Sequence, residues 1–109
     1  MKTYQTNKTQ SATLLAAKLR AELPLAFDGK INTLAQLNIL EKENNIEIWL
    51  PAPYQDYLYK IEIDGVNVNI SKSEHYTDDV NSLAMEDVLM DIIIDFIGKE
   101  NIEAIAPSA

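Results

Sequence analysis

The chain has 109 residues, an apolar fraction of 47% and a charged fraction of 24%, which is the composition of one soluble globular domain. It contains no cysteine, which excludes disulfide scaffolds, thiolate zinc sites and cysteine nucleophiles. The net charge is −8, and three bases against fourteen acids after residue 42 give that part of the chain a surface that repels nucleic acid and anionic membranes but favours basic proteins.

The N-terminal residues 1–9 are polar, and we expect them, like residues 104–109, to be flexible. They carry charge but no apolar stretch of the kind that a secretory signal needs. The apolar runs elsewhere are far shorter than the ~20 residues of a membrane span. We therefore expect a single cytoplasmic domain over residues 1–109 that makes no membrane contact.

The first predicted helix begins after Ser11, a suitable N-cap, and runs to about Leu23. Its leucines recur every fourth residue on a narrow stripe, so it covers a neighbouring layer on one side only. Pro24 directly follows and is a normal helix stop. The pair Asp28-Gly29 then indicates a turn.

Residues 33–43 can be read as helix or as strand. Thr33 and Gln36 have the spacing of a capping box, which favours a helix. Apolar and polar residues alternate at 37–39 and again at 46–50, which favours strands. We favour two paired strands that turn near Glu43-Asn44.

The clearest hairpin signal is Asp64-Gly65 between two alternating runs, which predicts a type I′ turn. A two-residue loop there pairs Ile63 with Val66 and places the apolar side chains of both strands on one face. The polar side chains fall on the other face, which we expect to be wet.

The last predicted helix is capped by Asp78 or Asp79, starts near Val80 and ends near Gly98. Its apolar residues within 83–97 form an arc far wider than the ~100° of a helix that rests on one surface. It must be covered by the sheet together with the first helix or a second subunit. The expected fold is α+β, with N- and C-terminal helices packed on a three- or four-stranded antiparallel sheet (α-β-β-β-β-α).

A row of aspartates, Asp87, Asp91 and Asp95, follows the polar edge of this helix. Repulsion between neighbours costs a few tenths of a kcal/mol, which is small beside the ~1.5–3 kcal/mol from burying each apolar side chain. The row therefore needs no role beyond keeping one edge soluble. The alternative is a line of negative charge that competes with phosphate for a basic partner.

A metal site would need these aspartates to converge, together with His75, Asp78 or Asp79. Successive helical turns instead spread carboxylates along the axis. His75, the single histidine, lies in a polar connector and is expected to be a solvent-exposed loop residue. No phosphate-binding glycine loop and no framed nucleophile occurs. We therefore expect no enzyme activity, no metal and no cofactor.

An aromatic segment provides a second candidate contact through Trp49, Tyr54 and Tyr57. Trp49 has the strand parity opposite to its apolar neighbours, so it falls on the wet side of the sheet. Trp and Tyr are enriched among binding hot spots because they bring large contact area at low entropic cost. The alternative is that a second layer covers this face and makes Trp49 a core residue.

Together these features predict a non-catalytic acidic protein-binding module. The first hypothesis is an inhibitor that mimics nucleic acid and masks a basic surface of a partner, as nuclease-toxin immunity proteins and phage anti-defence (anti-CRISPR) proteins do. The alternative is a dimeric adaptor or secretion-type chaperone that dimerises through the apolar face of residues 83–97, and it rests on fold-level analogy. The predicted partner-binding residues are Asp87, Asp91, Asp95, Trp49, Tyr54 and Tyr57.

Overall fold

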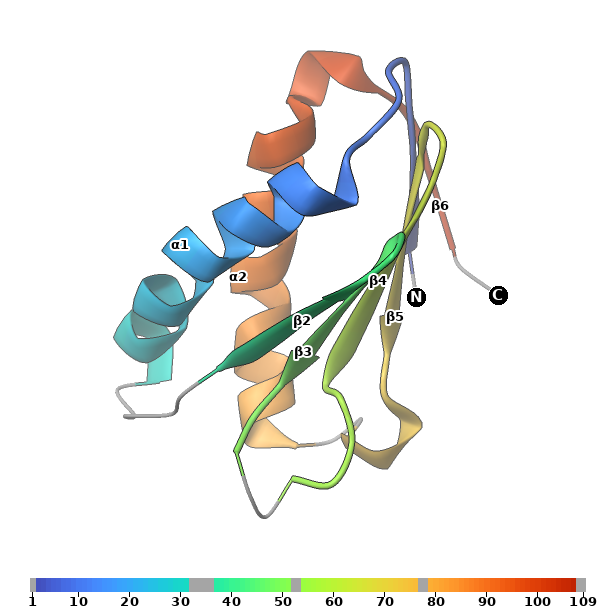
Figure 1. Cartoon of the computed structure of the whole chain (residues 1–109). Coiled ribbons are helices and arrows are strands. Elements are labelled where there is room, and N and C mark those ends of the chain that lie inside the picture. The colour runs from blue at the N-terminus through green and yellow to red at the C-terminus, as the bar shows by residue number, and fades with distance from the viewer. Residues whose placement is uncertain (1, 32–36, 52–53, 77–78, 108–109) are drawn as a thin grey trace.

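The computed structural model describes residues 2–31, 37–51, 54–76 and 79–107, in which two helices pack on one face of a six-stranded sheet (Figure 1). The helices and strands in chain order are β1 (Lys2–Thr6), α1 (Ala12–Ile31), β2 (Asn38–Lys42), β3 (Asn45–Trp49), β4 (Tyr59–Asp64), β5 (Asn67–Lys72), the short 3-10 helix η1 (Glu74–Tyr76), α2 (Val80–Ile97), the 3-10 helix η2 (Lys99–Asn101) and β6 (Ile102–Ala106).

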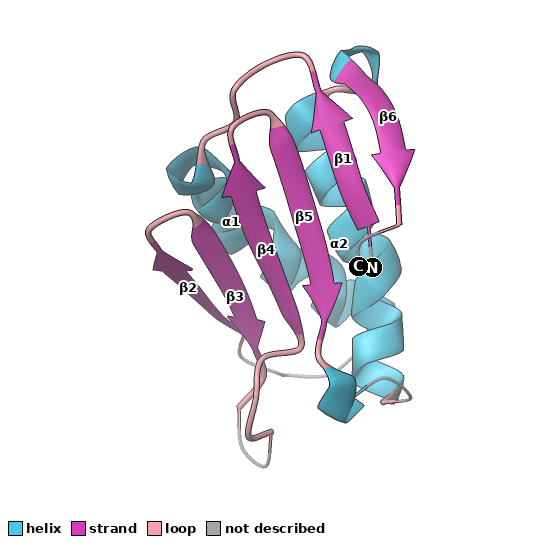
Figure 2. Cartoon of the chain, turned by 90° about the vertical axis from the view of Figure 1, so that its right-hand side faces the viewer, coloured by secondary structure: helices cyan, strands magenta, loops and turns pink. Residues whose placement is uncertain are grey.

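The sheet order is β2-β3-β4-β5-β1-β6, and every neighbouring pair is antiparallel. Figure 2 shows the sheet face that no helix covers, with α1 and α2 behind it. The predicted α+β class with helices on an antiparallel sheet is confirmed. The expected number of strands is wrong, because the described residues form six strands instead of three or four.

The two additional strands, β1 and β6, lie where we expected flexible ends. Of the segments expected to be flexible, residues 2–6 and 104–106 lie in paired strands. β1 lies between β5 and β6, with the side chains of Tyr4 and Thr6 buried. The hydroxyl of Thr6 donates to the Val66 carbonyl at 2.8 Å. Pairing with a distant part of the chain supplies order that a short polar segment does not signal by itself.

Helix α1 begins as predicted and ends later than predicted. The Ser11 Oγ accepts from the Leu14 N–H at 3.2 Å, which confirms the N-cap. The expected stop at Pro24 and the turn at residues 28–29 are wrong, because α1 continues through both. The leucine stripe extends to Phe27, which is fully buried. Burying such a side chain contributes ~1.5–3 kcal/mol and offsets the ~3 kcal/mol cost of an internal proline.

The strand interpretation of the next segment is confirmed for the described residues. β2 and β3 form a hairpin in which Lys42 pairs with Asn45 across the predicted Glu43-Asn44 turn. Glu43 adopts a φ of 53°, in the left-handed region. The proposed capping box at Thr33 and Gln36 lies outside the described residues.

The β4–β5 hairpin has a different register from the predicted one. Ile63 pairs with Val68 rather than Val66, so the loop residues are Gly65 and Val66 instead of Asp64 and Gly65. Gly65 has a φ of 61° and occupies the first loop position, where type II′ turns place glycine. Val66 is therefore 40% exposed at the tip and does not join the core.

Contacts with the chain's N-terminal part explain this register. The Val66 carbonyl accepts from the Thr6 N–H at 3.0 Å, and the Gly65 carbonyl accepts from the Gln10 N–H at 2.9 Å. The two loop carbonyls are thus bound to the last residue of β1 and to the segment that joins β1 to α1. These long-range hydrogen bonds stabilise the observed loop, in which Gly65 occupies the position that a type II′ turn favours for glycine.

Helix α2 agrees with the prediction at both ends. Asp79 is the N-cap and accepts from the Asn81 and Ser82 N–H groups, and Gly98 is the C-cap with a φ of 86°. The wide apolar arc is explained because α1 packs against one side of α2 while the sheet covers another. The cover expected from the sheet and the first helix is therefore present, and the arc does not require a second subunit.

Candidate protein-binding site

The predicted aspartate row is exposed along α2. Asp87, Asp91 and Asp95 all lie on the solvent side of the helix, and the Asp95 side chain is 73% exposed. The buried residues of the same helix occupy the opposite side. This arrangement fits both interpretations of the row: a solvent-exposed helix edge without a further role, and a line of negative charge that binds a basic partner.

Asp95 has an additional role that the row pattern does not reveal. Lys18 of α1 extends its Nζ to Asp95 Oδ2 at 2.8 Å and to Glu22 Oε2 at 2.7 Å. These hydrogen bonds, led by the one to Asp95, raise the pKa of Lys18. One lysine therefore serves two carboxylates and links α1 to α2. The pairing could not be read from the sequence because Lys18 and Asp95 are far apart in it.

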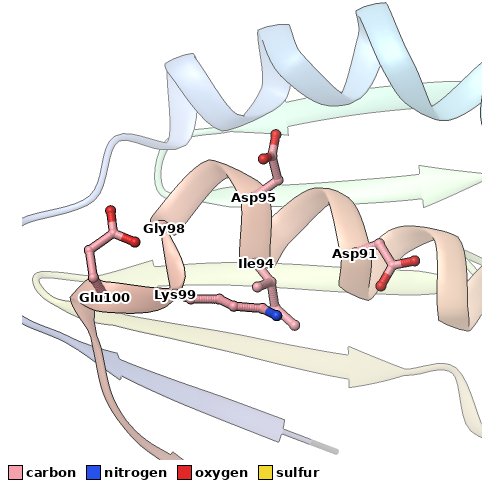
Figure 3. A pocket seen from close by; sticks show the side chains of 6 residues that line it. All are labelled: Asp91, Ile94, Asp95, Gly98, Lys99 and Glu100. Carbon is pink, nitrogen blue, oxygen red and sulfur yellow. The ribbon is translucent and has the colours of Figure 1, made fainter.

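An open hollow of about 590 Å³ lies beside Asp91 and Asp95, at the C-terminal end of α2 (Figure 3). In Figure 3 Asp95 points toward α1, whereas Asp91 and Ile94 point away from it. Backbone carbonyls at the end of a helix add negative potential to that of nearby carboxylates. The hollow therefore favours a cationic group. Its lining residues are Asp91, Ile94, Asp95, Gly98, Lys99 and Glu100.

Asp91 also lies close to the sheet. The hydroxyl of Tyr4 on β1 donates to Met90 Sδ at 3.6 Å, one residue before Asp91. Burial raises the pKa of Tyr4, and the negative charge of Asp91 raises it further. Asp91 is thus close enough to β1 for its charge to act on Tyr4.

The residues considered for a metal site do not come together. Among the described residues, no group of three or more His, Asp or Glu side chains could hold a metal ion, and Asp78 lies outside them. Asp79 is used as the α2 N-cap. The His75 side chain is 72% exposed on η1, as expected for a surface histidine, and its Nε2 lies 3.5 Å from Asp56 Oδ2.

Trp49 lies on the uncovered sheet face, as its strand parity predicts. It is half-buried, and its Nε1 donates to Glu47 Oε1 at 3.0 Å. Lys42 Nζ approaches the same oxygen at 3.4 Å. Both helices pack on the other face, so neither of them makes Trp49 a core residue (Figure 2). A shallow hollow of about 400 Å³ adjoins it, lined by Leu37, Asn38, Trp49, Leu50 and Pro51.

Tyr54 has a structural role that sequence reasoning missed. Its hydroxyl donates to Asp79, with distances of 2.8 and 3.0 Å to the two carboxylate oxygens, and accepts from Asn81 Nδ2 at 2.9 Å. Its ring packs edge-on against Tyr76 at 5.0 Å. Burial raises the pKa of Tyr54. These contacts tie the β3–β4 loop to the start of α2, while Tyr57 is half-buried in the same loop.

The six predicted residues therefore occupy three separate places. The aspartates lie in the helical layer, and Trp49 lies on the opposite face of the sheet. Tyr54 and Tyr57 lie in the β3–β4 loop, where Tyr54 supports the α2 N-cap. The structure does not combine them into one patch. The residues that sequence reasoning missed are Lys18 and Glu100, which modify the charge around the aspartate row.

Searches against family models, curated proteins and solved structures find no significant match to the chain. No helix in the described part of the chain is long and apolar enough to cross a membrane.

Proposed function

We propose that this chain is a non-catalytic, cytoplasmic protein-binding module that inhibits its partner by covering a basic, nucleic-acid-binding surface. The observation that carries the proposal is the exposed row of Asp87, Asp91 and Asp95 on a helix whose other sides are held by the core. A helix spaces such carboxylates ~6 Å apart on a rigid support. Fixed carboxylates accelerate encounter with Lys and Arg and compete with phosphate for them.

The hollow at the end of the row supports the same proposal. Asp91, Asp95 and Glu100 surround it, and Lys99 is the one base among its lining residues. A lysine or arginine of the partner would meet several carboxylates there, beside the apolar side chain of Ile94. Contacts between exposed charges in an open hollow contribute to encounter rate and specificity more than to affinity.

The proposed contact is narrower than the one expected from the sequence. It comprises the aspartate row and the hollow, because Tyr54 is engaged with Asp79 and the strand parity of Trp49 places its side chain on the sheet face opposite the helices. The alternative of a dimeric adaptor was based on the wide apolar arc of α2. Because α1 and the sheet cover this arc, it no longer argues for a dimer.

The test is capture of partners from the source cells with the tagged protein, washed at low and high salt and identified by mass spectrometry. The test variant carries Asp87→Lys, Asp91→Lys and Asp95→Lys. The matched control carries Glu62→Lys, Asp64→Lys and Glu74→Lys, which change the net charge equally at exposed positions away from α2.

We expect a basic nucleic-acid-binding protein that is retained by the control, released by salt and lost from the α2 variant. Exposed ion pairs are worth about 0–1 kcal/mol, so loss of the Lys18 contact leaves the fold intact. Equal loss of the partner from both variants would show that binding depends on net charge and not on the position of the aspartates. Binding that survives reversal of the row would refute the proposal.

A further inference from the structure

The two edges of the sheet differ in how they are protected. At the β2 edge, α1 lies alongside the strand. The Arg20 guanidinium donates to the Ile39 carbonyl from Nε at 3.3 Å and from Nη2 at 3.1 Å. The hydroxyl of Thr13 donates to Glu41 at 2.7 Å. Side chains of α1 thus occupy the β2 edge and obstruct the approach of another strand.

The β6 edge has backbone groups directed outward. In β1 the backbone groups of successive residues point alternately to the two neighbouring strands. The Thr6 N–H points to the β5 side, where it donates to the Val66 carbonyl, so the backbone groups of Thr3 and Gln5 point to β6. Their partners in β6 are Ala106 and Ala104. Ile105 lies between these two residues, so its N–H and C=O point away from β1. No hydrogen bond from a described residue reaches them.

The side chains of β6 do not obstruct this edge. The strand reads IEAIA, with one charge at Glu103 and no proline. Ile105 is 58% exposed although it lies opposite the buried Tyr4. Natural edge strands are usually blunted by lysine, proline, a bulge or a cover, and an unblunted apolar edge is a template for another strand. β6 carries one of these features, a bulge at Glu103, because Gln5 pairs with Ala104 and Thr6 pairs with Ile102. The bulge lies two residues before Ile105, whose pairing with Tyr4 is regular.

We propose that β6 pairs with an extended basic segment of a partner protein, which adds as a seventh strand beside Ile105. The partner's positive charge rests on the function proposed above, whereas the pairing rests on the free edge. Backbone hydrogen bonds give affinity in this mode of recognition and alternate side chains give specificity.

Charge decides between a basic segment and a second copy of the chain. A second copy brings another net charge of −8 and a second Glu103 to the same seam. A basic strand meets complementary charge instead. Tyr4, which pairs with Ile105, contacts Met90, and the next residue is Asp91. The aspartate row therefore borders the face on which half of the added side chains would project.

The probe is a short acetylated peptide in which lysine and valine alternate, with a glutamate–valine peptide as its charge control. Ile105→Pro removes the outward N–H without touching the pairing to β1, and proline is tolerated at such edge positions. Ile105→Thr is the matched control, because it keeps the N–H and a β-branched side chain. Affinities are measured by calorimetry, and thermal melts check that both variants are folded.

We expect the lysine peptide to bind the unmodified protein and Ile105→Thr with similar affinity. It should bind Ile105→Pro roughly 2- to 12-fold more weakly, which corresponds to the loss of one backbone hydrogen bond. N-methylation along one edge of the peptide should abolish binding, while N-methylation along the other edge should have no effect. This second measurement tests the pairing even where Ile105→Pro does not fold.

Four results would overturn the inference. Equal binding of the glutamate peptide would exclude a basic partner segment. A dimer that dissociates in Ile105→Pro would assign the edge to a second copy. A third such result is peptide binding that is unchanged by Ile105→Pro and by N-methylation but lost in Asp91→Lys. That result would exclude strand pairing at β6 and would be consistent with the proposed function. Failure of both peptides to bind would also refute the inference, while partner capture tests the function separately.

Discussion

Replacing Ser82 with alanine removes a hydroxyl that is fully buried between α2 and the sheet. Its Oγ has no hydrogen-bond partner among the described residues. The Ser82 carbonyl accepts from the Tyr59 hydroxyl at 2.9 Å, and this backbone contact does not depend on the side chain. A buried polar group without a partner costs ~1–3 kcal/mol, and alanine is the better helix former by ~0.5 kcal/mol. Allowing for the packing of the lost oxygen, Ser82→Ala should stabilise the fold by about 1–2 kcal/mol.

Ser73 provides a matched control because it is a second buried serine whose hydroxyl is satisfied. Its Oγ accepts from the His75 N–H at 3.2 Å. Ser73→Ala leaves that N–H without its partner and should destabilise the fold by about 1 kcal/mol. The two substitutions delete the same atom and are expected to have opposite signs.

Both variants are measured by urea unfolding, with the midpoint read at an unchanged m-value. In a domain of this size a change of 1 kcal/mol moves the melting temperature by roughly 4–8 °C. A neutral or destabilising Ser82→Ala would refute the reasoning. It would mean that the hydroxyl is satisfied in solution, and a bound water detected by crystallography would identify the partner.

Three further effects on stability are expected. Glu43→Gly relieves the left-handed φ of 53° and should raise the free energy of unfolding by about 1 kcal/mol, whereas Glu43→Val should lower it in the same urea titration. Asp79→Ala removes both the α2 N-cap and the acceptor of the Tyr54 hydroxyl, and should cost about 1–3 kcal/mol, with Asp79→Asn recovering part of it. Burial raises the pKa of Tyr59 to about 12, so the stability that this neutral phenol contributes is complete below pH 10 and is lost between pH 10 and 12, by about 3 kcal/mol. A Tyr59→Phe variant that loses as much stability over that pH range would contradict this assignment.

The features predicted correctly are those whose causes are local. The N-cap and C-cap of α2 lie within a few residues of the helix ends that they define. The alternating side chains of β3, β4 and β5 place one set inward regardless of what the strands pair with. Strand parity also put Trp49 on the uncovered face. Such patterns are written in adjacent residues and can be read without the fold.

The features predicted incorrectly depend on contacts between distant residues. The β4–β5 register shifts because Thr6 and Gln10 bind the hairpin tip. α1 continues beyond Pro24 because Phe27 finds a buried site. Strand β1, in which Tyr4 is the one apolar side chain, is ordered by its pairing with β5 and β6. Neither composition nor spacing encodes which distant segment will supply the missing hydrogen bonds.

The same distinction applies to the candidate site. The aspartate row was visible from its spacing, but its electrostatic character depends on Lys18, which neutralises part of the charge at Asp95 while leaving Asp91 on the other side of the hollow. Tyr54 had the residue type of a binding anchor and is instead held by the α2 N-cap. Residue type indicated where polar and aromatic contacts are available, and only the fold determined which of them face outward.

The proposed aspartate contact and the β6 edge belong to one end of the molecule. α2 ends at Ile97, and only Gly98 and the short η2 separate it from β6. The Asn101 side chain donates to the Ile97 carbonyl at 2.9 Å, and its own carbonyl accepts from the Asn7 N–H at 3.0 Å. This connection fixes the end of the helix relative to both terminal strands. A partner that reaches the hollow therefore approaches the β6 edge without crossing the sheet, whereas Trp49 on the uncovered face could take part only through a separate contact.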